Sequence, residues 1–245
     1  MLKDNLLYAT EIPITQNIYI KIPTMKEIID YDNSANEDYY NLVTQICANP
    51  RDFAVQLHEA GLRYNKIRRY DLFNIFFKTF IVNGVDLSMI FKDFDISQLR
   101  DVVNKYDKVV WVNYKNEVII DEIIYSVIED NLRKLTGLVR CDGKAGNSIQ
   151  YEREIADKKR KLEKKKRSHK IESSYLERQI VAMVNNKDFP YDYETIKNIT
   201  LYQFNKSVEQ VLRNTNVNCM TQSAYIGMID TSKINQKELS LVKLD

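Results

Sequence analysis

The histidines and cysteines are the residues best suited to metal or nucleophilic chemistry, and they are few. The histidines are His58 and His169, and the cysteines are Cys47, Cys141 and Cys219. No second histidine or cysteine stands at metal-ligand spacing from either histidine, and there is no CxxC motif. A Cys47–His58 nucleophile pair would require one helix end to fold back on another, so we expect His58 to be a half-buried structural residue.

Acidic residues gather in three places, and structural roles explain most of them. The groups are Asp93 with Asp95, Asp121 with Glu122, and Asp188 with Asp192 and Glu194. Metal-dependent nucleases place acids at strand ends, which would suit Asp121, but Asp121 is also a good helix N-cap. The GKAG sequence at 143–146 lacks the pattern of a phosphate-binding loop. We therefore predict no enzyme, no metal site and no cofactor, with a nuclease as the least favoured alternative.

One stretch, residues 151–170, dominates the charge pattern. It holds ten Lys or Arg and four acids, a surplus of six, whereas the whole chain has a formal net charge of +2. Its large apolar residues, Tyr151, Ile155 and Leu162, form a thin helical stripe that cannot order the stretch alone. Two interpretations stay open: a solvated helix or flexible linker, or a contact for a polyanion or an acidic partner.

The cations of this stretch are the candidate partner-binding residues. No aromatic residues are interleaved with them, and no nucleic-acid-binding module is recognisable, so nucleic acid is the secondary choice of partner. The candidates are Lys158, Lys159, Arg160, Lys161, Lys164, Lys165, Lys166 and Arg167.

The hydrophobic patterns predict a mostly helical α+β protein, in keeping with only 6 Gly and 4 Pro in 245 residues. A strand is expected over 12–22, and a hairpin over 109–120 with Trp111 at least half buried. We predict an α+β domain at 1–140, a basic connector at 141–170 and a helical part at 171–245. Helices are predicted over 25–31, 37–48, 53–60, 68–82, 122–135, 175–184, 194–197, 201–215 and 221–228, with a short helical turn within 86–95.

Several segments together resemble a tail-morphogenesis family of tailed phages and prophages of low-GC Gram-positive bacteria. The likeness lies in hydrophobic spacing and turn residues, covers most of the chain except the basic stretch, and carries over no functional residue. The family is similar to tail-assembly chaperones and baseplate-hub assembly proteins. The segments are 18–32, 37–61, 70–77, 118–138, 189–212 and 225–240.

The resemblance implies a non-enzymatic phage structural or tail/baseplate assembly protein that acts through protein–protein contacts. Its partners would be other phage morphogenesis or tail proteins, with oligomerisation left open. The alternative is a nucleic-acid-associated protein that uses the basic stretch. Three widely spaced cysteines favour a reducing compartment, and no apolar run is long enough to span a membrane. We therefore expect the bacterial host cytoplasm, with retention in the virion left open.

Overall fold

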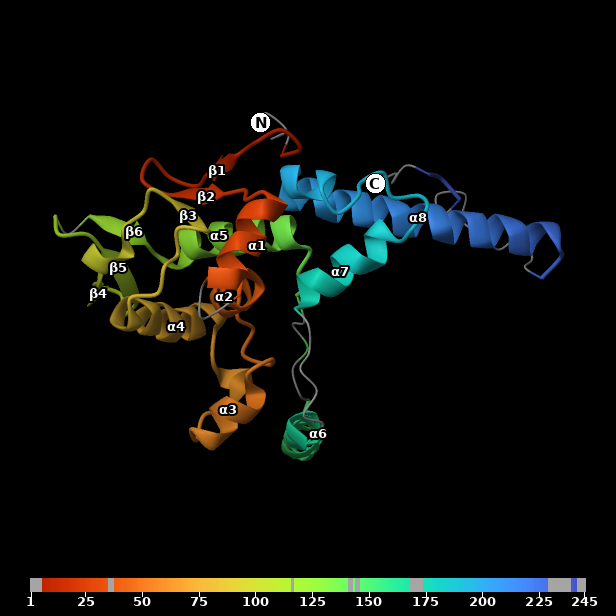
Figure 1. The fold of residues 1–245 in the computed structure, drawn as a ribbon. Coiled ribbons are helices and arrows are strands. Elements are labelled where there is room, and N and C mark those ends of the chain that lie inside the picture. Colours follow the sequence, from red (N-terminus) through yellow and green to blue (C-terminus); the bar gives the residue numbers. More distant parts are fainter. Residues whose placement is uncertain are drawn as a thin grey trace. The chain divides into compact units, whose positions relative to one another are not determined.

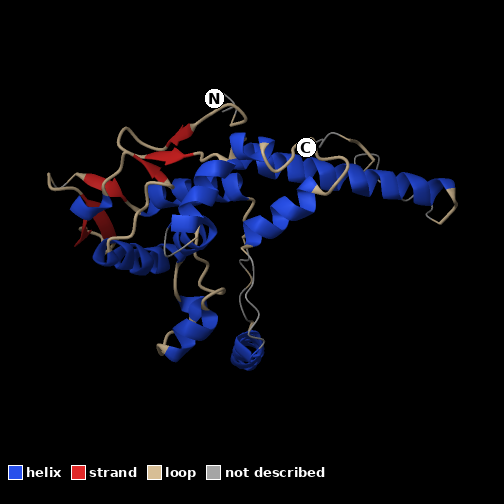
Figure 2. Ribbon diagram, in the orientation of Figure 1, coloured by secondary structure: helices blue, strands red, loops and turns tan. Residues whose placement is uncertain are grey.

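A computed structural model of the chain describes residues 6–34, 38–115, 117–140, 143, 146–167, 174–228 and 239–241. The chain divides into two compact units, the first formed by 1–23 and 27–172 and the second by 24–26 and 173–245. Figure 1 labels the elements, and Figure 2 shows that helices predominate over two small groups of strands. The predicted mostly helical α+β fold is confirmed.

The first sheet of the first unit has the antiparallel order β1-β2-β3, with strands at Glu11–Pro13, Tyr19–Lys21 and Phe91–Lys92. The single strand predicted over 12–22 is therefore wrong: the chain reverses between β1 and β2, where the Ile14 N–H donates to Ile18 O at 2.9 Å. The polar residues between these two isoleucines favour such a turn. β3 lies within the stretch where a helical turn was predicted.

The second sheet has the order β4-β5-β6, with strands at Arg100–Val103, Val109–Val112 and Val118–Ile120. The β5–β6 pair confirms the predicted hairpin, and β4 was not predicted. Trp111 in β5 pairs with Ile120 and is 2% exposed, which confirms its predicted burial. Its Nε1 donates to Asn74 Oδ1 at 2.9 Å, so the indole is buried with its polar group satisfied.

Six helices complete the described part of the first unit, together with two short 3₁₀ turns. Asp38 caps α2 and Asp121 caps α5, the latter by accepting from the N–H groups of Ile123 and Ile124. Gly137 ends α5 with a φ of 73°, a conformation that glycine adopts without strain. The helices are α1 (Met25–Ser34, whose first two residues belong to the second unit), α2 (Tyr39–Ile46), α3 (Ala54–Glu59), α4 (Arg69–Asn83), α5 (Glu122–Thr136) and α6 (Ser148–Arg167), and the turns are η1 (Tyr64–Lys66) and η2 (Ile96–Gln98).

Aromatic residues of α4, α5 and β5 form the centre of the first unit. Phe73 has its ring centroid 4.9 Å from that of Phe77 and 4.5 Å from that of Tyr125, and Phe77 meets Trp111 edge-on at 4.9 Å. Large apolar side chains of this kind each contribute about 1.5–3 kcal/mol on burial. The helix predicted at 68–82 therefore lies in the core through its aromatic face.

The second unit contains α7 (Tyr175–Val184), η3 (Thr195–Asn198) and the long α8 (Leu201–Tyr225). Thr200 and Gln203 form a reciprocal capping box at the start of α8. The two helices predicted at 201–215 and 221–228 are one continuous helix, because the residues between them include no Gly or Pro.

Candidate functional site: the cationic helix α6

Helix α6 carries most of the basic stretch, and its sequence favours a helix from end to end. Residues 148–167 contain no Gly and no Pro, and twelve of the twenty are Lys, Arg or Glu, which are good helix formers. Asn147 begins the helix, because its Oδ1 accepts from the Gln150 N–H at 2.8 Å. The first unit reaches Glu172, so α6 groups with it rather than with the second unit.

The inner face of α6 is defined by Tyr151 and Ile155, which are 2% and 3% exposed. The Tyr151 ring stacks on Tyr64 with centroids 5.3 Å apart, and its hydroxyl lies 3.4 Å from Nδ1 of His58. Leu162, the third residue of the predicted stripe, is 40% exposed. The first half of the helix is therefore packed, so the interpretation of residues 151–170 as a flexible linker is wrong for this half. The two residues join a cluster with Ala48, Ala54, Leu57, Tyr64 and Leu72.

A polar clamp supports this packing. Glu154 accepts from Arg51 Nε at 2.7 Å and from the Tyr64 hydroxyl at 2.8 Å, and Lys158 Nζ donates to the carbonyl oxygen of Arg51. Burial opposes ionisation of Glu154, but these two hydrogen bonds and the nearby cations outweigh it and hold the pKa of the carboxyl below its usual value. The clamp therefore fixes α6 in rotation, with one face against its own unit.

Two of the candidate cations lie at this docked side. Lys158 takes part in the clamp, and Lys159 lies 3.3 Å from the Glu59 carboxylate of α3. Both side chains are only partly exposed, at 30% and 38%. Their structural contacts make Lys158 and Lys159 weaker candidates for partner binding than the residues that follow them.

Three other candidates form a row on the opposite face. Arg160, Lys164 and Arg167 are all exposed, and helix geometry at 100° per residue places them together, about 120–180° from Tyr151 and Ile155. Arg160 and Arg167 have side chains 82% and 84% exposed. The ion pairs of Arg160 with Asp157 and of Arg167 with Glu163 are each 4.0 Å long, so these two pairs are loose.

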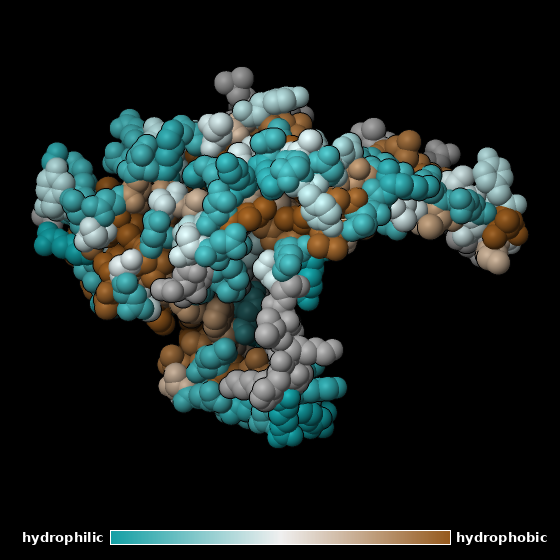
Figure 3. Space-filling model, viewed as in Figure 1, coloured by the Kyte–Doolittle hydropathy of each residue, from teal (hydrophilic) through white to brown (hydrophobic). Residues whose placement is uncertain are grey.

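Arg153 belongs to the same row, although the sequence analysis did not select it. It is exposed and lies seven residues, or two helical turns, before Arg160. Extending the periodicity backwards from Arg160 would have found it. We call Arg153, Arg160, Lys164 and Arg167 the outer row; it extends about 21 Å along the helix axis at 1.5 Å per residue. Hydrophilic residues cover α6 in Figure 3.

The remaining candidates are on the flank of the row or outside the description. Lys161 is exposed between the row and the docked side. The side chains of Lys165 and Lys166, and residues 168–170, lie outside the described residues, as do Cys141 and His169. Six of the eight predicted cations have described side chains, and all six are exposed or partly exposed. Three of them, Arg160, Lys164 and Arg167, lie in the outer row.

The residues considered for catalysis have structural surroundings. Burial raises the pKa of the Cys47 thiol to about 12, so the thiol stays protonated, and its sulfur lies 3.9 Å from the Glu129 carbonyl oxygen. His58 instead faces Tyr151. Asp95, Asp121 and Asp192 each accept backbone N–H groups at helix or turn starts, as the capping interpretation predicted. Within the described ranges, no group of three or more His, Cys, Asp or Glu is arranged to hold a metal ion.

The C-terminal part of the chain is similar to a phage-related domain family. Residues 164–240 match the YomV second domain. YomV is encoded by a Bacillus phage or prophage, which agrees with the phage origin that the sequence resemblance implied. Comparison with curated proteins and with solved structures gave no significant match. In the part of the chain that the structure describes, no helix has the length and apolarity needed to cross a membrane.

Proposed function

We propose that the protein is a non-enzymatic phage protein that acts through protein–protein contacts in tail or baseplate assembly. In this proposal the outer row of α6 binds an acidic surface of another morphogenesis protein. The observation that carries it is the docking of α6: Tyr151, Ile155 and Glu154 hold one face, and the opposite face presents four cations in a line.

Stability does not account for the outer row. Exposed ion pairs contribute about 0–1 kcal/mol, and the pairs Arg160–Asp157 and Arg167–Glu163 are long and solvated. A cationic row on a fixed helix is suited to recognition, because complementary charge steers encounter and sets orientation. Since the clamp already restricts the helix, less conformational freedom is lost on binding.

Two further observations support the choice of a protein partner in a phage context. The match of residues 164–240 to the YomV second domain supports a phage origin. Residues 152–167 of α6 include no aromatic residue on which bases could stack beside the outer row, which makes single-stranded nucleic acid the less suitable ligand. The host cytoplasm is the site of action in this proposal.

The proposal is tested by capture of partners during phage growth. The outer-row variant replaces Arg153, Arg160, Lys164 and Arg167 by Ser. A control variant with the same net charge replaces four exposed lysines elsewhere, namely Lys105, Lys115, Lys134 and Lys187, by Ser. Tagged wild type, outer-row variant and control are recovered from nuclease-treated lysates of cells making phage, and captured proteins are identified by mass spectrometry.

We expect wild type and control to recover the same tail or baseplate proteins, and the outer-row variant to recover at least about tenfold less, which corresponds to about 1.4 kcal/mol. Equal recovery by all three proteins would show that the row is only a solvated surface. If nucleic acid is captured instead, and is lost in moderate salt, the nucleic-acid alternative replaces the protein contact.

A further inference from the structure

A cavity of about 340 Å³ opens in the first unit, on segments that the proposed partner contact does not use. Its walls come from the turn between α2 and α3, at 49–51, and from the chain at 64–69, which contains η1 and the start of α4; Gly143 completes the lining. Cavities of this size suit small ligands or a few residues of a peptide. Pro50, Tyr64 and Ile67 give it an apolar side.

The other side of the cavity is cationic. Arg51, Lys66, Arg68 and Arg69 line it, and none of the described lining residues is acidic. Lys66 is exposed and the three arginine side chains keep 37%, 53% and 32% of their surface exposed. Each cation therefore remains accessible to a ligand.

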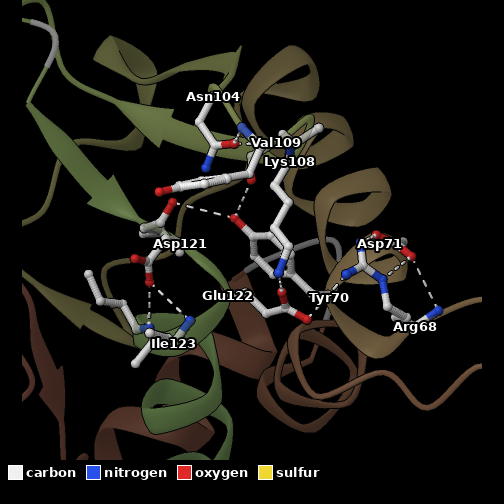
Figure 4. A network of polar contacts seen from close by, with 12 residues as sticks. Arg68, Tyr70, Asp71, Asn104, Lys108, Val109, Asp121, Glu122 and Ile123 are labelled. Carbon is white, nitrogen blue, oxygen red and sulfur yellow. Dashed lines mark hydrogen bonds and ion pairs between the residues drawn. The ribbon is translucent and has the colours of Figure 1, made fainter.

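Acidic side chains outside the lining fix the arginines in place. Figure 4 shows Arg68, which donates to Asp71 through Nη2 at 2.7 Å and through Nε at 3.0 Å, and lies 3.4 Å from Glu122. Arg51 is held by Glu154, as described for the clamp of α6. Paired arginines of this kind are pre-organised, so they lose little freedom on binding an anion.

Arg69 is held by the most buried carboxylate of the group. Its Nη1 lies 3.3 Å from Oε1 of Glu129, which is 1% exposed and also receives Arg133 at 2.8 Å and Arg140 at 3.4 Å. One carboxylate thus contacts three guanidinium groups, and Arg140 also pairs with Asp130.

A buried polar atom adds a second requirement. Asn65 lines the cavity, and its side-chain Oδ1 is buried with no hydrogen-bond partner among the described residues. A buried acceptor of this kind is costly unless a donor reaches it. A matching ligand would therefore present an N–H or O–H group close to its negative charge.

We propose that this cavity is a binding site for an oxyanion, a phosphate or carboxylate with a neighbouring N–H or O–H donor. Arginine forks match the geometry of both groups. Two sources have this chemistry: a small phosphorylated hydroxy compound, or an acidic peptide segment whose amides supply the donor. The site goes beyond the proposed partner contact, because no outer-row residue lines the cavity.

Binding of two probes to the full chain tests the site. Glycerol 3-phosphate and a blocked tetraglutamate peptide are titrated by calorimetry in phosphate-free buffer of low ionic strength. The test variant is Lys66→Ser with Arg68→Gln, and Lys66→Ser alone is a milder version that removes one exposed side chain. The control, Lys78→Ser with Lys92→Ser, removes two exposed cations of the same unit that do not line the cavity.

We expect at least one probe to bind wild type, the control and the outer-row variant alike, and to bind the double variant at least about tenfold more weakly. The single variant should show a smaller loss in the same direction. Preference for glycerol 3-phosphate identifies a small phosphorylated ligand, and preference for the peptide identifies an acidic segment. Absence of binding by both probes, or equal binding by wild type and both pocket variants, would overturn the proposal. An equal loss in the control would do the same, because it would show diffuse attraction only.

Discussion

The two halves of α6 differ in both charge and surroundings: residues 148–157 hold one cation and three acids, whereas residues 158–167 hold eight cations and one acid. In the first half, Tyr151 and Ile155 are 2% and 3% exposed, and Glu154 accepts hydrogen bonds from its own unit. In the second half, Arg160 and Arg167 have side chains more than four-fifths exposed. The difference shows that the apolar residues and the paired acid, which are concentrated in the first half, determine which part of the helix packs. Two apolar residues four apart, with an acid placed opposite an arginine, dock a helix whose other half is strongly basic.

The ion pairs of the two halves differ in the same way. Glu154 lies 2.7 Å from Arg51 and its side chain is 16% exposed, whereas Arg160 lies 4.0 Å from a solvated Asp157. A short and partly buried pair resists solvent screening, and a long exposed pair does not. The first half is thus built for attachment, and the second half leaves its charge available.

The largest expected effect comes from removing the aromatic anchor of the docked half. Tyr151→Ala should destabilise the first unit by about 3 kcal/mol, because it leaves a cavity beside Tyr64. Arg160→Ala should change stability by no more than about 0.5 kcal/mol. Urea unfolding followed by the fluorescence of Trp111, which lies in the same unit, measures both. A loss below about 1 kcal/mol for Tyr151→Ala would contradict tight docking.

A smaller, pH-dependent effect should come from the clamp. The folded-state pKa of Glu154 is lowered, so its contribution to stability is present above the unfolded-state pKa near 4.5 and is lost as pH falls through the lower folded-state value. Glu154→Gln should therefore be less stable than wild type at pH 7, and the difference in their free energies of unfolding should become smaller below about pH 4.5. Urea midpoints measured from pH 7 to pH 3 test this. A stability difference that does not change with pH would show that the charge of the carboxylate does not stabilise the clamp.

The two halves should also differ in their susceptibility to protease. Limited trypsin treatment should cut after residues between Arg160 and Arg167 before it cuts after Arg153 or Lys158, because cleavage requires local unfolding and the first half is packed. Mass spectrometry of the early fragments gives the order. Earlier cleavage at Arg153 than at Arg160 would reverse the comparison.

The smallest effect on stability should come from the outer row. Replacing its four cations by Ser should shift the melting temperature by no more than about 2 °C, since exposed charges contribute little and the pairs Arg160–Asp157 and Arg167–Glu163 are long. Differential scanning calorimetry of the variant beside the matched lysine control measures this. A fall well beyond that of the control would mean that the row supports the fold and is not reserved for a partner.

Much of the fold could be predicted from local patterns. Asp121 and Gly137 bracket α5 as their residue types indicate, and Trp111 is buried as its β-branched neighbours suggested. The errors came from distant contacts. β3 has only two residues and exists because it pairs with β2, more than 70 positions earlier in the chain, and no local pattern contains that pairing.

The candidate site was predicted in part. Charge density located the cations, and the spacing of Tyr151 and Ile155 correctly indicated one helical face. The partners of that face, Tyr64 and Arg51, lie some 90 to 100 positions away, so the sequence could not show that the helix docks. Without the docked face, neither the inner position of Lys158 nor the outer position of Arg153 could be assigned. The cavity proposed to bind an oxyanion also joins segments that are distant in the sequence, at 49–51, 64–69 and 143.

Hydrogen exchange along α6, measured with and without the captured partner, tests the central claim most directly. In the free protein, amides 151–158 should exchange at least about tenfold more slowly than amides 160–167, because packing protects the first half. Addition of the partner should slow exchange over 160–167 and leave 151–158 nearly unchanged. Uniform exchange along the free helix, or a partner effect confined to the first half, would contradict the account of a helix docked by one half that binds through the other.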